Sequence, residues 1–259
     1  MSAATAAGIR TVIVGASGRM GGQLLRLIGQ FPALKLHGAV ASERSAALGQ
    51  DAAAHNGLAP CGVMITQSLP PLLHGADLVI DFSQASAVAA NLAACVAARV
   101  PMLIGTTALP RELEAPLSVA AKSIALLVAA NTSLGVNLLM ELVRQAACAL
   151  PPSYDIKIVE VHHRGKRDAP SGTALALGAA AADGRAVSAA EIDIASLRGG
   201  DVVGEHEVWF LGEGERLLLK HSATDRAVFA RGALAAGEWL AGRNPGRYAI
   251  SDVFIRKII

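Results

Sequence analysis

Short apolar runs alternate with longer helical patterns through the first half of the chain. Continuous or β-branched apolar runs predict strands at residues 11–14, 36–40, 77–82, 100–104 and 124–129. Apolar residues at helical spacing, or alanine-rich stretches, predict helices at residues 23–28, 85–98 and 111–122. Strands that alternate with helices in this way are typical of βαβ units, and therefore of a parallel, doubly wound sheet covered on both faces.

The alternation changes after about residue 133. A linking helix at 138–150 is followed by a strand at 155–161, a helix at 173–182, and clustered strands at 193–198, 205–210, 215–221 and 227–229. Clustered strands after a single helix predict a mixed or antiparallel sheet, hence a second domain of α+β type. We expect one domain of residues 1–133 plus 240–259 and another of residues 134–239, with a final helix at 232–241 that returns the chain to the first.

Composition narrows the class of protein. The 259 residues are 53% hydrophobic, enough for a substantial core and a smaller second unit. A net charge of +2 and an aromatic content of 3% argue against a nucleic-acid surface. No apolar run reaches the roughly 18 residues of a membrane span, and the N-terminal residues lack a basic segment followed by an apolar one. We therefore expect a soluble, cytoplasmic protein without a secretory signal.

The number and spacing of the cysteines are typical of free thiols in a reducing compartment. Cys61, Cys95 and Cys148 are odd in number, widely scattered and without CxxC spacing. Such a set fits neither a disulfide framework nor a zinc site, so we expect buried thiols and no metal.

Three spaced glycines lie between the first predicted strand and the first predicted helix. Gly15, Gly18 and Gly21 would let the backbone turn sharply and approach a pyrophosphate, which the N–H groups of the helix start would bind. The spacing is GxxGxxG rather than GxGxxG, and any tight turn favours some glycine. Placement on the first βα turn nevertheless predicts dinucleotide binding and a Rossmann-like sheet, with Arg19 available to a phosphate.

The end of the second predicted strand bears on the choice of nicotinamide cofactor. A carboxylate at this place favours NADH, whereas a cation accommodates the 2′-phosphate of NADPH. Ser42 with Arg44 close by favours NADPH, while Glu43 leaves NADH open.

Later strand ends also carry small polar groups. Ligands of doubly wound sheets lie outside the carboxyl ends of the strands. Gly, Thr and Asn are common turn residues, so each strand end alone could be an ordinary turn. Because three strand ends carry such residues where a cofactor would lie, they predict a binding site for the nicotinamide. The segments are Phe82-Ser83, Gly105-Thr106-Thr107 and Ala129-Ala130-Asn131-Thr132.

The stretch EVHHRGKRDAPSGT, residues 160–173, concentrates chemically active side chains. His162 and His163 are adjacent, so on an extended segment they point in opposite directions. Their spacing is too close for a zinc site. Lys166 follows in a loop, and Ser171-Gly172-Thr173 begins a helix whose N–H groups suit a carboxylate. A structural histidine, a solvated lysine or a simple helix cap would each explain one residue alone. The presence of two histidines, a lysine and a helix start within a dozen residues instead predicts an acidic substrate that needs a neutralising charge and a proton.

These residues carry a resemblance to the 4-hydroxy-tetrahydrodipicolinate (dihydrodipicolinate) reductase family of the lysine and diaminopimelate route. Residues 160–174 match the family signature E-[AV]-H-H-x-x-K-x-D-x-P-S-G-T-A throughout. The resemblance covers essentially the whole chain, since further segments match in order: GASGRMG at residues 15–21, GTT at 105–107, N-x-S-[LV]-G-V-N at 131–137 and RGGDVVGEH at 198–206.

The resemblance implies roles for particular positions. His162 corresponds to the proton donor and Lys166 to the catalytic lysine, while His163, Ser171, Gly172 and Thr173 correspond to substrate-carboxylate contacts. It further implies hydride delivery to a cyclic imine dicarboxylate, and a homotetramer built through the sheet of the second domain. The implied and predicted cofactor contacts are Gly15, Ala16, Ser17, Gly18, Arg19, Met20, Ser42, Arg44, Phe82, Gly105, Thr106, Thr107, Ala129, Ala130, Asn131 and Thr132.

Three positions depart from the family pattern. Thr132 stands where an aromatic residue or Met is common beside the nicotinamide, and Gln84 stands where an Arg can follow the strand end. Ser42 replaces the acidic residue common in members that accept NADH. We expect all three to affect cofactor affinity or preference more than the reaction.

Two other functions remain open from the residues alone. A dehydrogenase of the homoserine or aspartate kind shares the two-domain plan and would oxidise its amino acid with NAD(P). A nicotinamide-binding sensor would use its second domain only to dimerise, which leaves His162 and Lys166 without a purpose. Supplying an amino-acid substrate, or finding tight NADPH binding without turnover, would distinguish them.

Overall fold

The computed structural model describes residues 8–253, and its contacts divide the chain into two compact units. Unit 1 comprises Met1–Thr132 and Phe229–Ile259, and unit 2 comprises Ser133–Val228. Residues 1–7 and 254–259 lie outside the described residues. Both ends of the expected first domain, and the expected absence of a secretory signal, fall on these residues.

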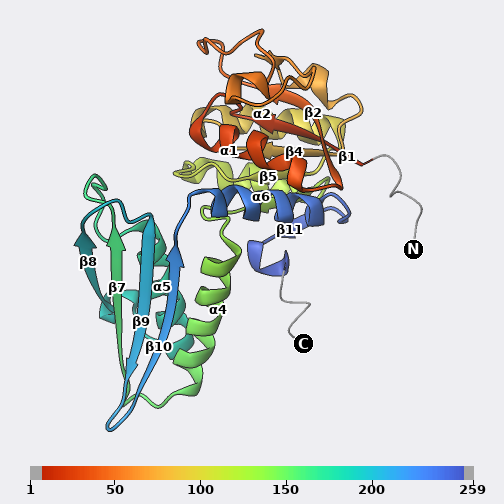
Figure 1. Ribbon diagram of the computed structural model, residues 1–259. Coiled ribbons are helices and arrows are strands. Elements are labelled where there is room, and N and C mark those ends of the chain that lie inside the picture. Colours follow the sequence, from red (N-terminus) through yellow and green to blue (C-terminus); the bar gives the residue numbers. More distant parts are fainter. Residues whose placement is uncertain (1–7, 254–259) are drawn as a thin grey trace. The chain divides into compact units, whose positions relative to one another are not determined.

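Unit 1 is built on a seven-stranded parallel sheet in the order β11-β6-β5-β4-β1-β2-β3 (Figure 1). The run 3-2-1-4-5-6 within it is the order of dinucleotide-binding sheets, whose direction of winding reverses between strands 1 and 4. The strands are β1 Ile9–Val14, β2 Leu34–Val40, β3 Ile65–Thr66, β4 Leu78–Asp81, β5 Met102–Ile104, β6 Ala125–Val128 and β11 Gly246–Tyr248.

Helices cover both faces of this sheet because its central strands are apolar on both faces. Val12, Val79 and Met102 share one face and pack with α2 (Ala85–Ala98) and α3 (Glu114–Ala120). On the other face, α6 (Ala227–Leu240) places Gly237 where an added Cβ would lie 2.9 Å from the Leu78 side chain. Helix α1 (Arg19–Leu27) follows β1 directly. Burial on both faces explains why these strands are continuous apolar runs in the sequence.

Unit 2 is a four-stranded mixed sheet with two helices on one face (Figure 1). Strand β7 pairs parallel with β8 and antiparallel with β9, and β9 pairs antiparallel with β10. Alternate β7 residues, from Ile156 to His162, are buried towards this helical face. The elements are α4 Leu134–Ala149, β7 Asp155–His162, α5 Gly172–Arg185, β8 Asp193–Arg198, β9 Gly204–Leu211 and β10 Arg216–Ala223.

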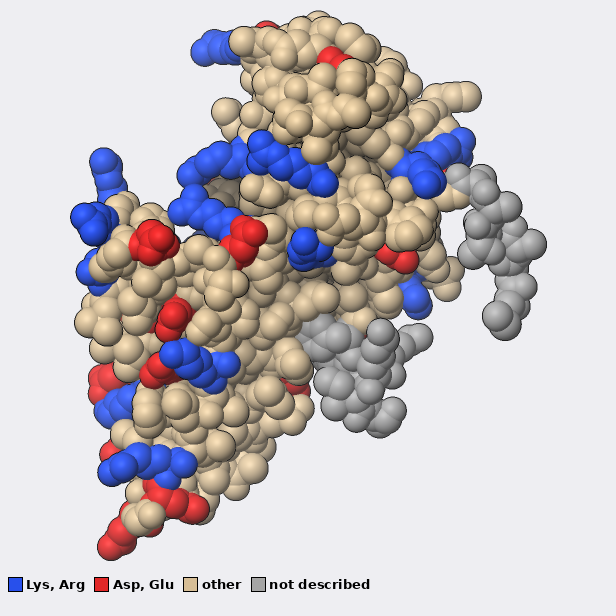
Figure 2. Space-filling model, viewed as in Figure 1, with Lys and Arg blue, Asp and Glu red and all other residues tan. Residues whose placement is uncertain are grey.

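No helix among residues 133–228 packs on the opposite face of the unit 2 sheet, which we call the outer face. Leu197 is 55% exposed and Leu218 39% exposed there. Charged pairs lie among these leucines, including Lys157 with Asp193 and Lys220 with Glu207. Figure 2 shows acidic and basic side chains intermixed over this unit. An apolar and charge-paired sheet face of this kind is a candidate interaction surface.

The predicted fold class is confirmed: a Rossmann-like parallel sheet and a second α+β unit on a mixed sheet. The five strands predicted in unit 1 are all present, and β3 and β11 are two short strands that the pattern did not reveal. The predicted strand at 227–229 is wrong, because α6 begins there. Asp225 Oδ1 accepts a hydrogen bond from the N–H of Ala227 at 2.9 Å and starts that helix. Unit 1 accordingly resumes at Phe229 rather than at the expected residue 240.

Among residues 8–253, every helix is too short or too polar to cross a bilayer.

Candidate active site

The turn after β1 shows why glycine stands at two of its positions. Gly15 has a φ of +83°, and a Cβ on it would lie 2.4 Å from the carbonyl oxygen of Phe82. A Cβ on Gly21 would lie 2.1 Å from the carbonyl oxygen of Gly15. The end of β1 therefore touches both the end of β4 and the first turn of α1. This contact lies at the switch point of the sheet, where dinucleotides bind in such folds.

The start of α1 fits a pyrophosphate. Gly18 is the N-cap residue in an extended conformation, so no side chain caps the first N–H groups of the helix. The first turn carries no acidic residue, and Arg19 is exposed at its beginning. An uncapped helix start with a positive dipole end and a nearby cation is suited to an anion. The predicted contacts Ala16, Ser17 and Met20 lie on the same turn.

A buried carboxylate organises the neighbouring strand ends. Asp81, at the end of β4, is fully buried and accepts hydrogen bonds from the N–H of Ser83 at 2.7 Å and from Asn91 Nδ2 at 2.8 Å. The hydroxyl of Thr106 donates to the carbonyl of Ser83 at 3.2 Å. A Cβ on Gly105 would lie 2.2 Å from the Phe82 ring. The structure thus brings the predicted segments after β4 and β5 together, and Asp81 is a residue that the sequence analysis missed.

The remaining predicted cofactor residues differ in exposure. Ser42 and Arg44 are exposed after β2, as are Thr107 after β5 and Ala130 after β6. Ala129 and Thr132 are buried. The Thr132 hydroxyl donates to the carbonyl oxygen of Phe229 at 2.7 Å, which joins the end of the first chain segment of unit 1 to the start of its second. The departure at Thr132 therefore has a structural use, and Asn131 lies beside it, half-buried.

In unit 2 the predicted proton donor is held by a buried carboxylate. Glu160 and His162 lie two residues apart on β7 and on the same covered face. Glu160 is fully buried, and its Oε2 lies 2.5 Å from His162 Nδ1. Arg198, at the end of the neighbouring strand β8, donates to both Glu160 oxygens at 2.7 and 2.9 Å. The backbone N–H of Ser171 donates to Oε1 at 3.1 Å.

These contacts set the charges of the pair. Burial opposes ionisation of Glu160, but hydrogen bonds from Arg198 and His162 outweigh it and lower its pKa to about 2. Burial lowers the pKa of His162, against the opposing effect of Glu160. Glu160 is thus a carboxylate at neutral pH, and the proton between the two side chains resides on Nδ1.

Two further histidines line the same face. His206 of β9 is paired with Glu160, and His221 of β10 is paired with His206. The His206 ring meets the His162 ring edge-on at 5.1 Å, and its Nε2 lies 3.2 Å from Ser171 Oγ. Burial, together with the charge of His162, lowers the pKa of His206 to about 4, so it is neutral at physiological pH. Neither histidine was predicted, because only strand register brings them to His162.

The other site residues predicted within 160–173 lie in the loop after β7 and at the start of α5. Lys166 Nζ lies 2.8 Å from Asp168 Oδ2, and His163 Nε2 lies 3.3 Å from Arg226 Nη2. His163 is directed differently from His162, as its adjacency predicts. Ser171 is buried and caps α5, since its Oγ accepts from the N–H of Ala174 at 3.1 Å. Gly172 and Thr173 form the first turn of α5. The roles of these side chains towards a substrate stay predictions.

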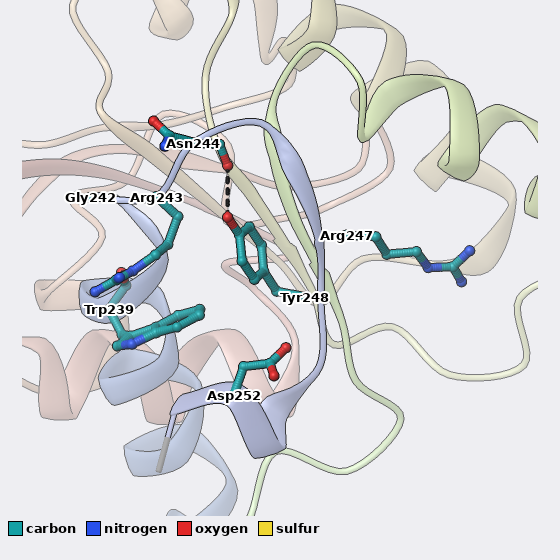
Figure 3. Close-up of a pocket in the computed structure, with 7 residues that line it drawn as sticks. All are labelled: Trp239, Gly242, Arg243, Asn244, Arg247, Tyr248 and Asp252. Carbon is teal, nitrogen blue, oxygen red and sulfur yellow. Dashed lines mark hydrogen bonds between the residues drawn. The ribbon is translucent and has the colours of Figure 1, made fainter. Parts of the chain in front are cut away.

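Unit 1 also contains a hollow of about 550 Å³ at the end of α6 and around β11 (Figure 3). Its polar groups bind one another: Tyr248 donates to the Asn244 carbonyl at 3.0 Å, and the Arg243 guanidinium lies 4.4 Å from the centre of the Trp239 ring. Arg247 also lines the hollow, and its guanidinium pairs with Glu114. None of the predicted site residues lines it, so we do not assign it to the active site.

Fold and site together define a class of protein. Unit 1 has the strand order of a dinucleotide-binding sheet and an uncapped helix start. Unit 2 holds a buried histidine–carboxylate pair beside a lysine. These features define a two-domain oxidoreductase. Profiles described as the N-terminus and the C-terminus of dihydrodipicolinate reductase match residues 9–132 and 135–254. The chain belongs to the dihydrodipicolinate reductase family, whose members are NAD(P)H-dependent enzymes.

Individual relatives agree with this assignment. The chain is 46% identical to the 4-hydroxy-tetrahydrodipicolinate reductase of Anaeromyxobacter dehalogenans strain 2CP-1, over 94% of this chain and 97% of the relative. It is 44% identical to that of Myxococcus xanthus, over 95% and 97%. Among solved structures, dipicolinate-bound dihydrodipicolinate reductase from Paenisporosarcina sp. TG-14 is similar with a TM-score of 0.81 and 23% identity, covering 93% of this chain and 97% of that one. An amine dehydrogenase from Mycobacterium smegmatis shares the fold at a TM-score of 0.62 and 14% identity, over 95% and 96%.

Proposed function

We propose that this protein reduces 4-hydroxy-tetrahydrodipicolinate to tetrahydrodipicolinate with a nicotinamide cofactor, in the diaminopimelate and lysine route. The observation that carries the proposal is the Glu160–His162 pair beside Lys166, within a chain about 45% identical over nearly its whole length to reductases of that name. Unit 1 would bind the dinucleotide, and unit 2 would bind the substrate and form the contacts between subunits.

The chemistry needs a hydride, which NAD(P)H supplies when bound. After loss of water, the substrate is a cyclic conjugated imine dicarboxylate, and reduction at its β-carbon leaves an enamine-like charge that takes up a proton. His162 is the proposed proton donor, because an imidazole in its charged form is an effective acid near neutral pH. Lys166 would place a positive charge beside one carboxylate and the developing anion.

The start of α5 suits the substrate carboxylate. Ser171 caps the helix from inside, and the first turn at Gly172 and Thr173 presents the positive end of the helix dipole. His163 lies on the preceding loop, where it would add a further polar contact. A dicarboxylate ligand agrees with the dipicolinate named in the structure of the Paenisporosarcina relative.

The choice of cofactor, the assembly and the location are further parts of the proposal. Ser42 and Arg44, exposed after β2, favour NADPH, since Arg44 can approach a 2′-phosphate. The outer face of the unit 2 sheet, with Leu197 and Leu218 exposed, supports a homotetramer. We also propose a cytoplasmic location, in agreement with a biosynthetic role.

The decisive experiment couples the protein to a synthase that makes the substrate from pyruvate and aspartate semialdehyde. Oxidation of NADPH and of NADH is followed separately by absorbance. We expect oxidation that depends on the synthase and on both of its substrates. If neither cofactor is oxidised, the proposed reaction is wrong.

The preference for NADPH has its own test in the Arg44→Ala variant. Removing the cation should raise the KM for NADPH about tenfold, equivalent to roughly 1.4 kcal/mol, and leave the KM for NADH nearly unchanged. Arg26→Ala, which removes an exposed cation from α1, is the control. Equal effects on the two cofactors would remove Arg44 from the 2′-phosphate site.

A further inference from the structure

Glu160 and Arg198 are buried or nearly so, carry charge, and take no part in the chemistry proposed above. We propose that Glu160 and Arg198 are a positioning pair, which fixes the tautomer of His162 so that Nε2 is the nitrogen that exchanges the proton in the reaction. This inference rests on the proposed function for its kinetic consequences, although the tautomer itself is a property of the protein alone.

The tautomer follows from hydrogen-bond chemistry. An ionised carboxylate only accepts hydrogen bonds, so the 2.5 Å contact from Glu160 Oε2 requires the proton on His162 Nδ1. Nδ1 then remains protonated whether His162 is neutral or charged, and Nε2 is the atom that gains and loses a proton. A Cβ on Gly204 would lie 3.0 Å from Nε2, so glycine at this place on β9 leaves room around the reactive atom.

Arg198 keeps the carboxylate available for this task. A buried carboxylate without a partner takes up a proton, and a protonated Glu160 would no longer require its partner to donate. The guanidinium binds both carboxylate oxygens, which is the strongest geometry for such a pair. It lowers the pKa of Glu160 and thereby holds it in the ionised, accepting form.

Arg198 also connects this pair to the loop of the catalytic lysine. Its Nη2 donates to the carbonyl oxygen of Asp168 at 2.6 Å, and Asp168 Oδ2 lies 2.8 Å from Lys166 Nζ. One guanidinium therefore orients His162 through Glu160 and anchors the segment that carries Lys166. The two proposed catalytic groups share a single anchor on β8.

The charges around His162 come from four directions. Glu160 on its own strand favours the imidazolium, whereas Arg198 on β8 and Lys166 in the loop disfavour it. On β9, His206 is the neighbouring titratable ring. Removal of the Glu160 charge takes away the favourable contribution and should lower the pKa of His162 further. Because a proton donor must be protonated, the loss of activity at high pH should then begin at a lower pH.

The first test measures the tautomer in the wild-type protein without substrate. Nitrogen-15 NMR of the histidine rings, with the His162 signals assigned by their absence in His162→Gln, reports which nitrogen carries the proton in the neutral form. We expect Nδ1–H. Finding Nε2–H would overturn the inference whether or not the protein reduces the cyclic imine. Finding Nδ1–H in a protein that lacks turnover would instead contradict the proposed function and still support the positioning role of Glu160 and Arg198.

The second test uses Glu160→Gln and the double variant Glu160→Gln with Arg198→Met. The single variant should lose about 10- to 100-fold in kcat with an unchanged KM for the nicotinamide, and its high-pH limb should shift to lower pH. The double variant leaves no unpaired buried charge, so it should recover thermal stability but not kcat.

Glu114→Gln, which removes an exposed carboxylate paired with Arg247 in unit 1, is the matched control. A Glu160→Gln variant with wild-type kcat and pH profile would contradict the inference. So would a double variant that regains wild-type kcat, because the pair would then only stabilise the fold. If the single variant does not fold, the double variant and the NMR measurement decide.

Discussion

His162 lies where burial and a neighbouring carboxylate have opposite effects on its charge. Burial against β9 disfavours the imidazolium, and the contact with Glu160 favours it. Burial has the larger effect and lowers the pKa of His162, while the Glu160 carboxylate opposes that shift. The side chain predicted to donate the proton thus contacts a buried carboxylate and a second histidine ring.

The His162→Gln substitution tests this role directly. It keeps a polar group of similar length but removes the transferable proton, so kcat should fall about 10²- to 10⁴-fold. The KM for the nicotinamide should change little, because the cofactor is expected to bind unit 1. Steady-state kinetics in the coupled assay provide the measurement, with the exposed His74→Gln as control. Near-full turnover in the variant would show that another group donates the proton.

His206 makes folding sensitive to acid. It is buried, and the pKa of its folded form lies near 4, whereas in the unfolded chain it is close to the ordinary 6.5. Between these values the unfolded state binds a proton that the folded state does not. The contribution of His206 to the unfolding free energy is therefore fully present above about pH 6.5 and is lost as the pH falls towards 4.

Replacing His206 with Gln should reduce this sensitivity. Urea unfolding at pH 7.5 and pH 5 should show a smaller loss of unfolding free energy in the variant than in the wild type. The difference should be on the order of 2 kcal/mol, because each unit of pKa depression corresponds to about 1.4 kcal/mol. His74→Gln should lose as much stability between the two pH values as the wild type does. An unchanged difference in His206→Gln would mean that this ring does not carry the effect.

At the scale of elements, the start of α1 trades helix stability for binding. Ser133 and Ser171 cap α4 and α5 with their side chains, whereas Gly18 provides no such cap for α1. Glycine at an N-cap costs a helix only about a few tenths of a kcal/mol relative to a Ser or Asp, so the stability given up is small. The same absence leaves N–H groups at the helix start for an anion, which explains the arrangement if the ligand is a pyrophosphate.

The Gly18→Asp variant separates these two effects. Gly18 has an extended conformation that Asp also adopts, with Gly15 O at 3.2 Å from the new Cβ as the closest contact. We expect a thermal unfolding temperature at or near that of the wild type, and cofactor binding weakened at least tenfold by charge repulsion. Fluorescence titration with NADPH measures the second quantity. Gly29→Asp adds the same charge at an open position and should bind normally. Normal binding by Gly18→Asp would place the pyrophosphate elsewhere.

At the scale of the whole molecule, the outer face of the unit 2 sheet is the proposed surface for contacts between subunits. Leu197 and Leu218 lie exposed among charged pairs, as expected for a face that is covered on assembly rather than on folding. A sheet with helices on one face only leaves such a surface available.

Leu197→Asp should therefore dissociate the proposed tetramer. The buried charge would have no partner at the interface, so the sedimentation coefficient should fall to that of a smaller species at micromolar concentration. Leu175→Asp on α5, a leucine that is 54% exposed but lies away from the outer face, should leave the assembly unchanged. A tetramer that persists in Leu197→Asp would place the subunit contacts elsewhere.

Local patterns were enough to predict most elements. Buried parallel strands such as β4 read as continuous apolar runs, and the alanine-rich helix α2 has the predicted bounds. The short strands β3 and β11 carry too few residues to form a pattern. The beginning of α6 was mistaken for a strand because three apolar residues fit either structure. In the structure the helix begins there, and Asp225 Oδ1 accepts a hydrogen bond from the N–H of Ala227.

The sequence by itself determined the fold class, the turn at Gly15 to Gly21, and the cluster from Glu160 to Thr173, because each depends on residues that are close along the chain. Only the tertiary structure decided the partners of His162. Arg198 and His206 lie 36 and 44 residues further along the chain, and the register of β8 and β9 against β7 brings them to it. Strand register is set by the packing of the whole unit 2 core, which no local pattern records. The same holds for Asp81, whose place among the strand ends depends on the order of strands in the sheet.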